Sequence, residues 1–174
     1  MPEQIPGGFP LTEEDYRLWL KYTTFTHELG HVWFCHADTN SYEDWLNETG
    51  AEWSSLLFLL HKGEQEVFQK FYSIREYEHK VNGEEIKSKD RYRPNDVHGS
   101  GVVLFHMIYE KYGKDTVVEL LRILSEMEKQ ATDDFLNHVE NKLGKDIADF
   151  IKDRLIQGSF YNLVTVYQLM YVNY

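Results

Sequence analysis

Two histidines separated by three residues, His27 and His31, form the pattern H-E-x-x-H with Glu28 between them. On an α-helix, residues four apart lie on one face, so both imidazoles could bind a single metal ion. A helix rarely supplies a third ligand to the same ion, and Glu48, in the acidic stretch that follows, is the candidate for it. Catalytic zinc sites use three protein ligands and leave a fourth position to water, so this set fits such a site.

Glu28 is adjacent to the first histidine, where its carboxylate could reach water at the ion rather than the ion itself. There it would act as a general base that accepts a proton and passes it on. H-E-x-x-H also occurs by chance on solvated helices, so the pattern alone does not establish a metal site. Here both histidines lie on a segment with an apolar face, and a second glutamate-rich helix follows, which favours the metal interpretation.

The helices expected to position these residues follow from the spacing of apolar residues. Thr12 precedes acidic residues typical of a first helical turn, and the pattern continues to about Cys35. Gly30 within this helix costs about 1 kcal/mol relative to alanine, which predicts that another element approaches closely there. Ser41, with acidic residues in the next turn, predicts a second helix that ends near Gly63.

Further helices are predicted over residues 64–80, 99–112, 115–127, 132–143 and 146–157. The polar segment 81–98 is long for a loop within a compact domain, and such loops are often functional. Residues 1–10, with three prolines, are predicted to form a loop or arm, and the tail after residue 158 fits either a strand or a docked helix. The sequence therefore predicts one mainly α-helical domain over residues 1–174, with any β-sheet abbreviated or absent.

The composition argues against several partners and locations. A net charge of −11 disfavours nucleic acid and anionic membranes, because phosphate contacts need a basic patch. Cys35 is the single cysteine, which excludes an intramolecular disulfide, and we expect it to be a small buried apolar residue. No apolar run approaches the roughly 20 residues of a membrane span, and the first residues lack the features of a signal peptide, so we expect a cytoplasmic location.

The stretch HELGHVWF followed by WLNETGAEW resembles the zinc signature of the gluzincin metallopeptidases, especially the aminopeptidase-N-like enzymes. The family pattern is approximately HELAHQWF and then WLNEGFAEW. The resemblance implies a zincin-like helical catalytic domain that hydrolyses peptide bonds in a peptide or protein substrate. It implies that zinc is bound by His27, His31 and Glu48. It also implies that Glu28 is the general base and acid, and that Glu52 supports a zinc-binding histidine.

Three features depart from the family pattern. Sixteen residues separate His31 from Glu48, two fewer than in the family, and the difference falls in the polar loop after Phe34. The G-x-M-E-N motif and its substrate-binding strand are not found ahead of the helix, so aminopeptidase activity is not implied and a partner chain could supply the strand. The family's catalytic tyrosine aligns with His98, which could donate to the oxyanion or merely cap a helix, and Tyr92 is the alternative donor.

Two other interpretations remain open. Small regulatory proteases that cleave a repressor also contain HELGH, although the aromatic WLNETGAEW fits the gluzincins better. A structural zinc site, or a non-catalytic binding module on a degenerate peptidase scaffold, would have no open coordination position. Among the other histidines, His106 is expected in the core and His79 on the surface.

Overall fold

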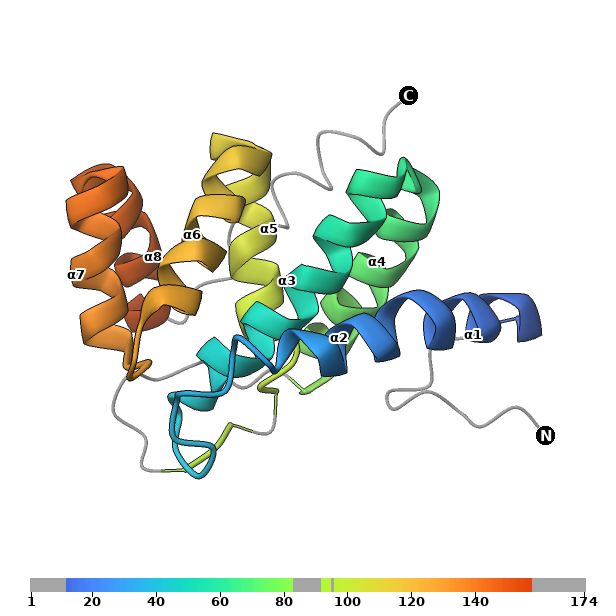
Figure 1. Ribbon diagram of the computed structural model, residues 1–174, viewed down its shortest axis with the longest axis horizontal. Helices are drawn as coiled ribbons and strands as arrows, with labels where there is room; N and C mark the ends of the chain where they lie inside the picture. The colour runs from blue at the N-terminus through green and yellow to red at the C-terminus, as the bar shows by residue number, and fades with distance from the viewer. Residues whose placement is uncertain (1–11, 83–91, 95, 158–174) are drawn as a thin grey trace.

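The computed structural model describes residues 12–82, 92–94 and 96–157, and these ranges are mainly α-helical and contain no β-strand (Figure 1). The elements are α1 (Glu13–Trp19), the π-helical turn η1 (Leu20–Thr24), α2 (Phe25–Gly30), α3 (Asp44–Lys62), α4 (Gln65–Asn82), α5 (Ser100–Tyr112), α6 (Lys114–Glu126), α7 (Thr132–Leu143) and α8 (Lys145–Gln157). The predicted mainly α-helical class is confirmed. The predicted N-terminal arm, most of the 81–98 loop and the tail lie outside the described residues. No helix in the described ranges is long and apolar enough to cross a bilayer.

The first helical segment is shorter than its apolar pattern predicts. Regular α-helix ends at Gly30 rather than near Cys35, and tighter turns follow, in which Val32 N donates to Leu29 O (3.1 Å) and Trp33 N to Gly30 O (2.9 Å). The chain turns there because Phe34 is buried against α3, in contact distance of Gly50. Burial of one aromatic ring therefore ends a helix that the periodicity alone would continue.

Helix α2 packs closely on α3, and in Figure 1 it crosses the lower part of α3. A Cβ atom added at Gly30 would lie 2.8 Å from the Cα of Ala51, so only glycine allows this separation. Thr26 Oγ1 also donates to Ser55 Oγ across the same contact (2.7 Å). The close approach predicted from Gly30 is confirmed, and the approaching element is α3.

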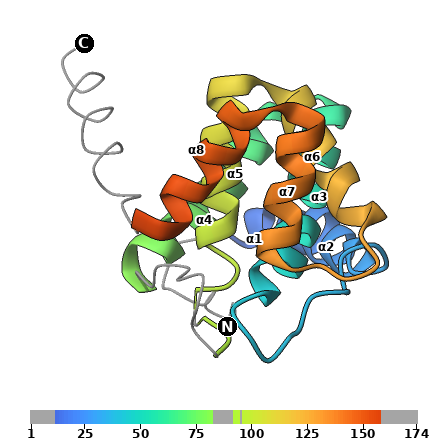
Figure 2. The same cartoon turned by 90° about the vertical axis from the view of Figure 1, so that its left-hand side faces the viewer.

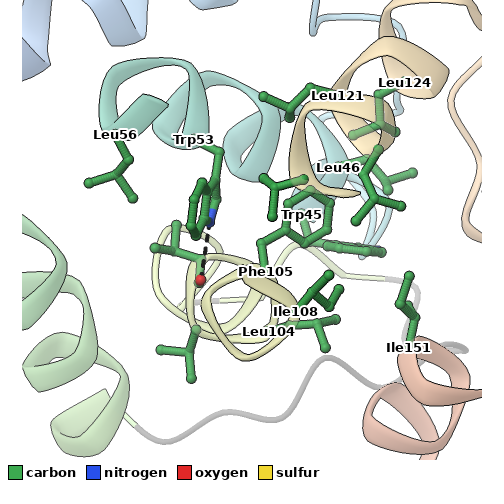
Figure 3. Close-up of a cluster of buried hydrophobic side chains, with 14 of the residues drawn as sticks. Trp45, Leu46, Trp53, Leu56, Leu104, Phe105, Ile108, Leu121, Leu124 and Ile151 are labelled. Carbon is green, nitrogen blue, oxygen red and sulfur yellow. Dashed lines mark hydrogen bonds between the residues drawn. The ribbon is translucent and has the colours of Figure 1, made fainter. Parts of the chain in front are cut away.

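Helix α3 crosses the core, and its two tryptophans anchor it to distant parts of the chain. The indole N–H of Trp53 donates to the carbonyl oxygen of Val102 in α5 (3.1 Å), as Figure 3 shows. The indole N–H of Trp45 donates to Thr132 Oγ1 at the start of α7 (2.9 Å). Both rings are fully buried, and burial of an aromatic side chain contributes roughly 2–3 kcal/mol. These contacts fix the position of the glutamates that α3 carries between the two tryptophans.

The remaining helices complete the core around α5. Phe105 and Ile108 of α5 are fully buried, and they lie beside α3 and α6 in Figure 3. Helices α7 and α8 lie side by side at the end of the molecule away from α1 (Figures 1 and 2). Among the described residues, α2 packs against α3, and Phe25 and Leu29 on it are exposed.

Candidate metal centre

Three side-chain atoms from α2 and α3 converge on one point. The Nε2 atoms of His27 and His31 lie 3.1 Å apart, and Glu48 Oε2 lies 3.4 Å from the first and 3.6 Å from the second. Ligand atoms in a tetrahedral zinc site lie about 2.0–2.1 Å from the ion, which places them about 3.3 Å from one another. The spacing of the three atoms therefore fits one tetrahedral ion.

The local backbone explains how these residues meet. His27 lies within α2, and His31 follows its last residue with φ −62° and ψ −11°, still right-handed helical values. The four-residue spacing therefore keeps both rings on one face, although the regular helix ends between them. Glu48 faces them from α3 because the Gly30–Ala51 contact holds the two helices close together.

The other nitrogen of each imidazole faces an oxygen atom, but only that of His31 lies at hydrogen-bond distance. The Nδ1 atom of His31 lies 3.0 Å from the carbonyl oxygen of Phe34, which can only accept, so Nδ1 carries the proton and Nε2 presents its lone pair. The Nδ1 atom of His27 lies 3.4 Å from Glu52 Oε1, the position expected for the supporting carboxylate. Sequence reasoning missed the Phe34 carbonyl, because a backbone oxygen carries no residue-type signal.

The two oxygens of Glu48 have different surroundings. Arg93 Nη2 donates to Oε1 (2.9 Å), whereas Oε2 is buried and accepts no hydrogen bond from the described residues. Burial alone would raise the pKa of Glu48, but His27, with His98 and His31, lowers it below its usual value. A buried carboxylate oxygen without a donor is costly, and a cation at this point would remove that cost.

A second cluster shares His27 and comprises its Nδ1 atom, Glu52 Oε1 and His98 Nδ1. Arg75 donates to the same Oε1 atom of Glu52. Burial would raise the pKa of Glu52, but the Arg75 guanidinium, together with His98 and His27, outweighs burial and lowers the pKa to about 2. Because the carboxylate oxygen here already holds a cationic partner, the first cluster, with its unpartnered oxygen, is the better metal centre.

The other predicted site residues differ in their exposure and in whether they contact the first cluster. Glu28 is exposed on α2, beside His27. His98 is 40% exposed, and its Nδ1 atom lies 3.2 Å from Glu48 Oε2, so the structure brings it to the edge of the cluster. Tyr92 is 80% exposed, so packing does not hold its phenol against the cluster. Of the two alternatives, His98 is the one that contacts the predicted ligands.

An open groove of about 450 Å³ borders the cluster. Its lining comprises residues of the segment between α2 and α3, residues of α3, and one residue of the segment between α4 and α5: His31, Cys35, Thr39, Asp44, Asn47, Glu48 and Arg93. Cys35 is exposed in this groove, so the expectation of a buried cysteine is wrong. The chain turns at Phe34, and burial of that ring directs the next residue outward.

One more expectation is corrected near His98. His79 was expected on the surface, but it is buried, with Nδ1 2.5 Å from Asp96 Oδ2 and 3.1 Å from Ser100 Oγ. This polar group ties α4 to the turn that carries His98. Its polar residues are far apart in sequence, so periodicity along one helix does not reveal that they meet.

Two arginines beside the centre were also missed by sequence reasoning. Arg93 lies in the polar segment 81–98 and Arg75 lies in α4, and neither belongs to a motif that marks it. They pair with Glu48 and Glu52, the glutamates that face the two histidines.

Comparisons of the chain with protein-family models, with curated proteins and with solved structures found no significant match.

Proposed function

We propose that this chain is a zinc-dependent metallopeptidase of the gluzincin type. The observation that carries the proposal is the convergence of His27 Nε2, His31 Nε2 and Glu48 Oε2 at the spacing of tetrahedral ligands, where the described part of the chain brings no hydrogen-bond donor to the buried oxygen. Zinc held there would supply Lewis-acid chemistry, polarising a peptide carbonyl and lowering the pKa of water towards about 7. Three protein ligands leave one position for this chemistry, and the adjoining groove gives a peptide access to it.

Glu28 is the proposed proton carrier. It is exposed on the helix that carries both histidine ligands, one residue after the first of them. From there its carboxylate would accept a proton from the attacking water and deliver it to the departing amide nitrogen. His98 is the proposed oxyanion donor: Nδ1 lies towards the two glutamates, which leaves Nε2 as the nitrogen that can face a substrate oxygen.

The proposed substrate is a peptide or protein bound along the groove. The described residues contain no β-strand that could align an extended peptide, so we retain the prediction that a partner chain supplies one. The net charge of −11 disfavours a nucleic acid as the substrate.

A structural zinc site is the second candidate, and one observation favours it. His98 Nδ1 lies 3.2 Å from Glu48 Oε2, at the edge of the three-atom cluster, so a small movement of this ring would bring a fourth ligand to the ion. A closed site of four protein ligands would leave no position for substrate. The number of protein ligands in the zinc-loaded chain distinguishes this candidate from the peptidase.

Glu28→Gln tests the catalytic proposal. We expect hydrolysis of a mixed fluorogenic peptide library to fall at least about 100-fold, because general acid–base catalysis contributes that much or more. Bound zinc, measured by elemental analysis, should stay at the wild-type level. Glu64→Gln, an equally exposed glutamate at the start of α4, is the matched control and should change neither readout.

Two outcomes would contradict the proposal. Activity retained by the Glu28→Gln chain would show that another group carries the proton. A wild-type chain that binds zinc through four protein ligands and cleaves no peptide of the library would support the structural site instead.

A further inference from the structure

Arg93 joins two acidic side chains of α3 at the edge of the candidate metal centre. Its Nε atom donates to Asp44 Oδ2, and its Nη2 atom donates to Glu48 Oε1 at 2.9 Å. Asp44 is itself buried, and Asn47 Nδ2 donates to its other oxygen (2.8 Å). The guanidinium is thus fixed at two points on a helix that the core already holds in place.

This arrangement makes the two oxygens of Glu48 unequal. Oε1 accepts from Arg93, while Oε2 lies 3.2–3.6 Å from one nitrogen each of His27, His31 and His98. A free carboxylate can bind a metal ion through one oxygen or through both. With a guanidinium on Oε1, only Oε2 is available to an ion at the two histidines.

We propose that Arg93 is a positioning residue that keeps Glu48 a one-oxygen ligand and so keeps a fourth coordination position open. The inference rests on the proposed zinc site. In this role Arg93 limits how many protein atoms coordinate the ion, whereas an ordinary surface ion pair would not affect coordination. The Arg93 side chain is 44% exposed and makes no part of the buried apolar core, so its loss should leave the fold intact even though the buried Asp44 loses its cationic partner.

The identity of the cation matters for this role. The planar guanidinium offers separate N–H groups to Asp44 and Glu48 at once, a geometry that the single ammonium of lysine does not reproduce. Lysine would keep the charge next to Glu48 but would not fix the carboxylate's rotation. A lysine variant therefore separates the effect of charge from the effect of orientation.

Cobalt(II)-substituted protein tests the proposal, because the visible absorption of cobalt weakens several-fold when coordination rises above four. We expect Arg93→Met to give the weaker spectrum of a five- or six-coordinate ion, as Glu48 binds through both oxygens. Arg93→Lys should give an intermediate spectrum. Arg122→Met, which removes an exposed arginine paired with Glu119 on α6, is the matched control and should match the wild type.

The outcomes separate this inference from the proposed function. If wild-type protein binds cobalt and His27→Ala abolishes that binding, the metal site stands; an unchanged Arg93→Met spectrum would then overturn the role of Arg93 alone. If wild-type protein binds no cobalt, the site itself fails. Should Arg93→Met not fold, a crystal structure of the zinc-loaded wild type decides: zinc on Oε2 with Arg93 on Oε1 supports the inference, and zinc on both oxygens overturns it.

Discussion

The Nε2 atoms of His27 and His31 and the Oε2 atom of Glu48 converge on one point, and this convergence is the central feature at the scale of single residues. A single proton could bridge the two Nε2 atoms, which lie 3.1 Å apart, but it would leave Glu48 Oε2 without a donor. One cation satisfies all three atoms. The Phe34 carbonyl oxygen orients the ring of His31, and Glu52 Oε1 lies 3.4 Å from Nδ1 of His27.

The predicted residues of the centre were found because their chemistry is carried by residue type and local spacing. His27 and His31 meet because they are four apart on a helix, and Glu48 follows in the next helix. Arg93 and Arg75 could not be found in this way, because their partners are 45 and 23 residues distant in sequence. Only the fold shows which carboxylate each arginine reaches.

His106 provides a prediction about pH. Its ring stacks on Tyr72, with centroids 3.6 Å apart, and burial lowers its pKa to about 4. The folded chain therefore favours the neutral ring, so this stability is present above pH 6.5 and is lost as the pH falls towards 4. At about 1.4 kcal/mol per pKa unit, we expect His106 to account for a loss of about 3 kcal/mol in the free energy of unfolding.

Urea denaturation of the metal-free chain at pH 7.5 and pH 4.5 measures this effect. His106→Phe keeps an aromatic ring against Tyr72 but cannot be protonated, so its stability should fall less between the two pH values. His138→Phe, at an exposed position on α7, is the matched control and should behave as the wild type does. An equal fall in the wild type and in His106→Phe would contradict the assignment.

At the scale of elements, the closeness of α2 and α3 determines whether the centre can form. A Cβ atom at Gly30 would lie 2.8 Å from backbone of Ala51, so Gly30→Ala must push the helices apart. Alanine's higher helix propensity contributes about 1 kcal/mol in the opposite direction. We expect the clash to win, lowering the free energy of unfolding by roughly 1–3 kcal/mol and weakening zinc binding about tenfold or more.

Leu29→Ala is the comparison for Gly30→Ala. Leu29 is the adjacent residue on the outer side of the same helix, and it is exposed, as are Phe25, Val32 and Trp33. Its replacement should change neither stability nor zinc affinity appreciably, as chemical denaturation and competition with a zinc chelator would show. Equal effects of the two substitutions would contradict the packing account.

Sequence periodicity gave most helices with the right bounds, and its errors have physical causes. The range 132–143 follows from apolar spacing and from the glycine that ends it, whereas the second helix ends before Gly63 as predicted but begins at Asp44 rather than directly after Ser41. The first helix was predicted too long, because burial of Phe34, a tertiary contact, ends it early. The π-helical turn at Leu20–Thr24 has no signal in the apolar pattern, and we have no physical account of it.

At the scale of the whole molecule, the core and the centre share α3. Its tryptophans bind α5 and α7, while Glu48 and Glu52, which lie between them in sequence, face α2. The ligand from α3 is therefore held by the most buried part of the fold, whereas α2 brings the two histidines from its edge. A bound ion would tie that edge to the core.

One measurement tests the metal centre most directly: an anomalous-scattering map, recorded at the zinc absorption edge, of crystals grown with zinc. We predict one peak about 2.0–2.2 Å from His27 Nε2, His31 Nε2 and Glu48 Oε2. No peak at these atoms, or a peak at His27 Nδ1, Glu52 and His98 instead, would contradict the account.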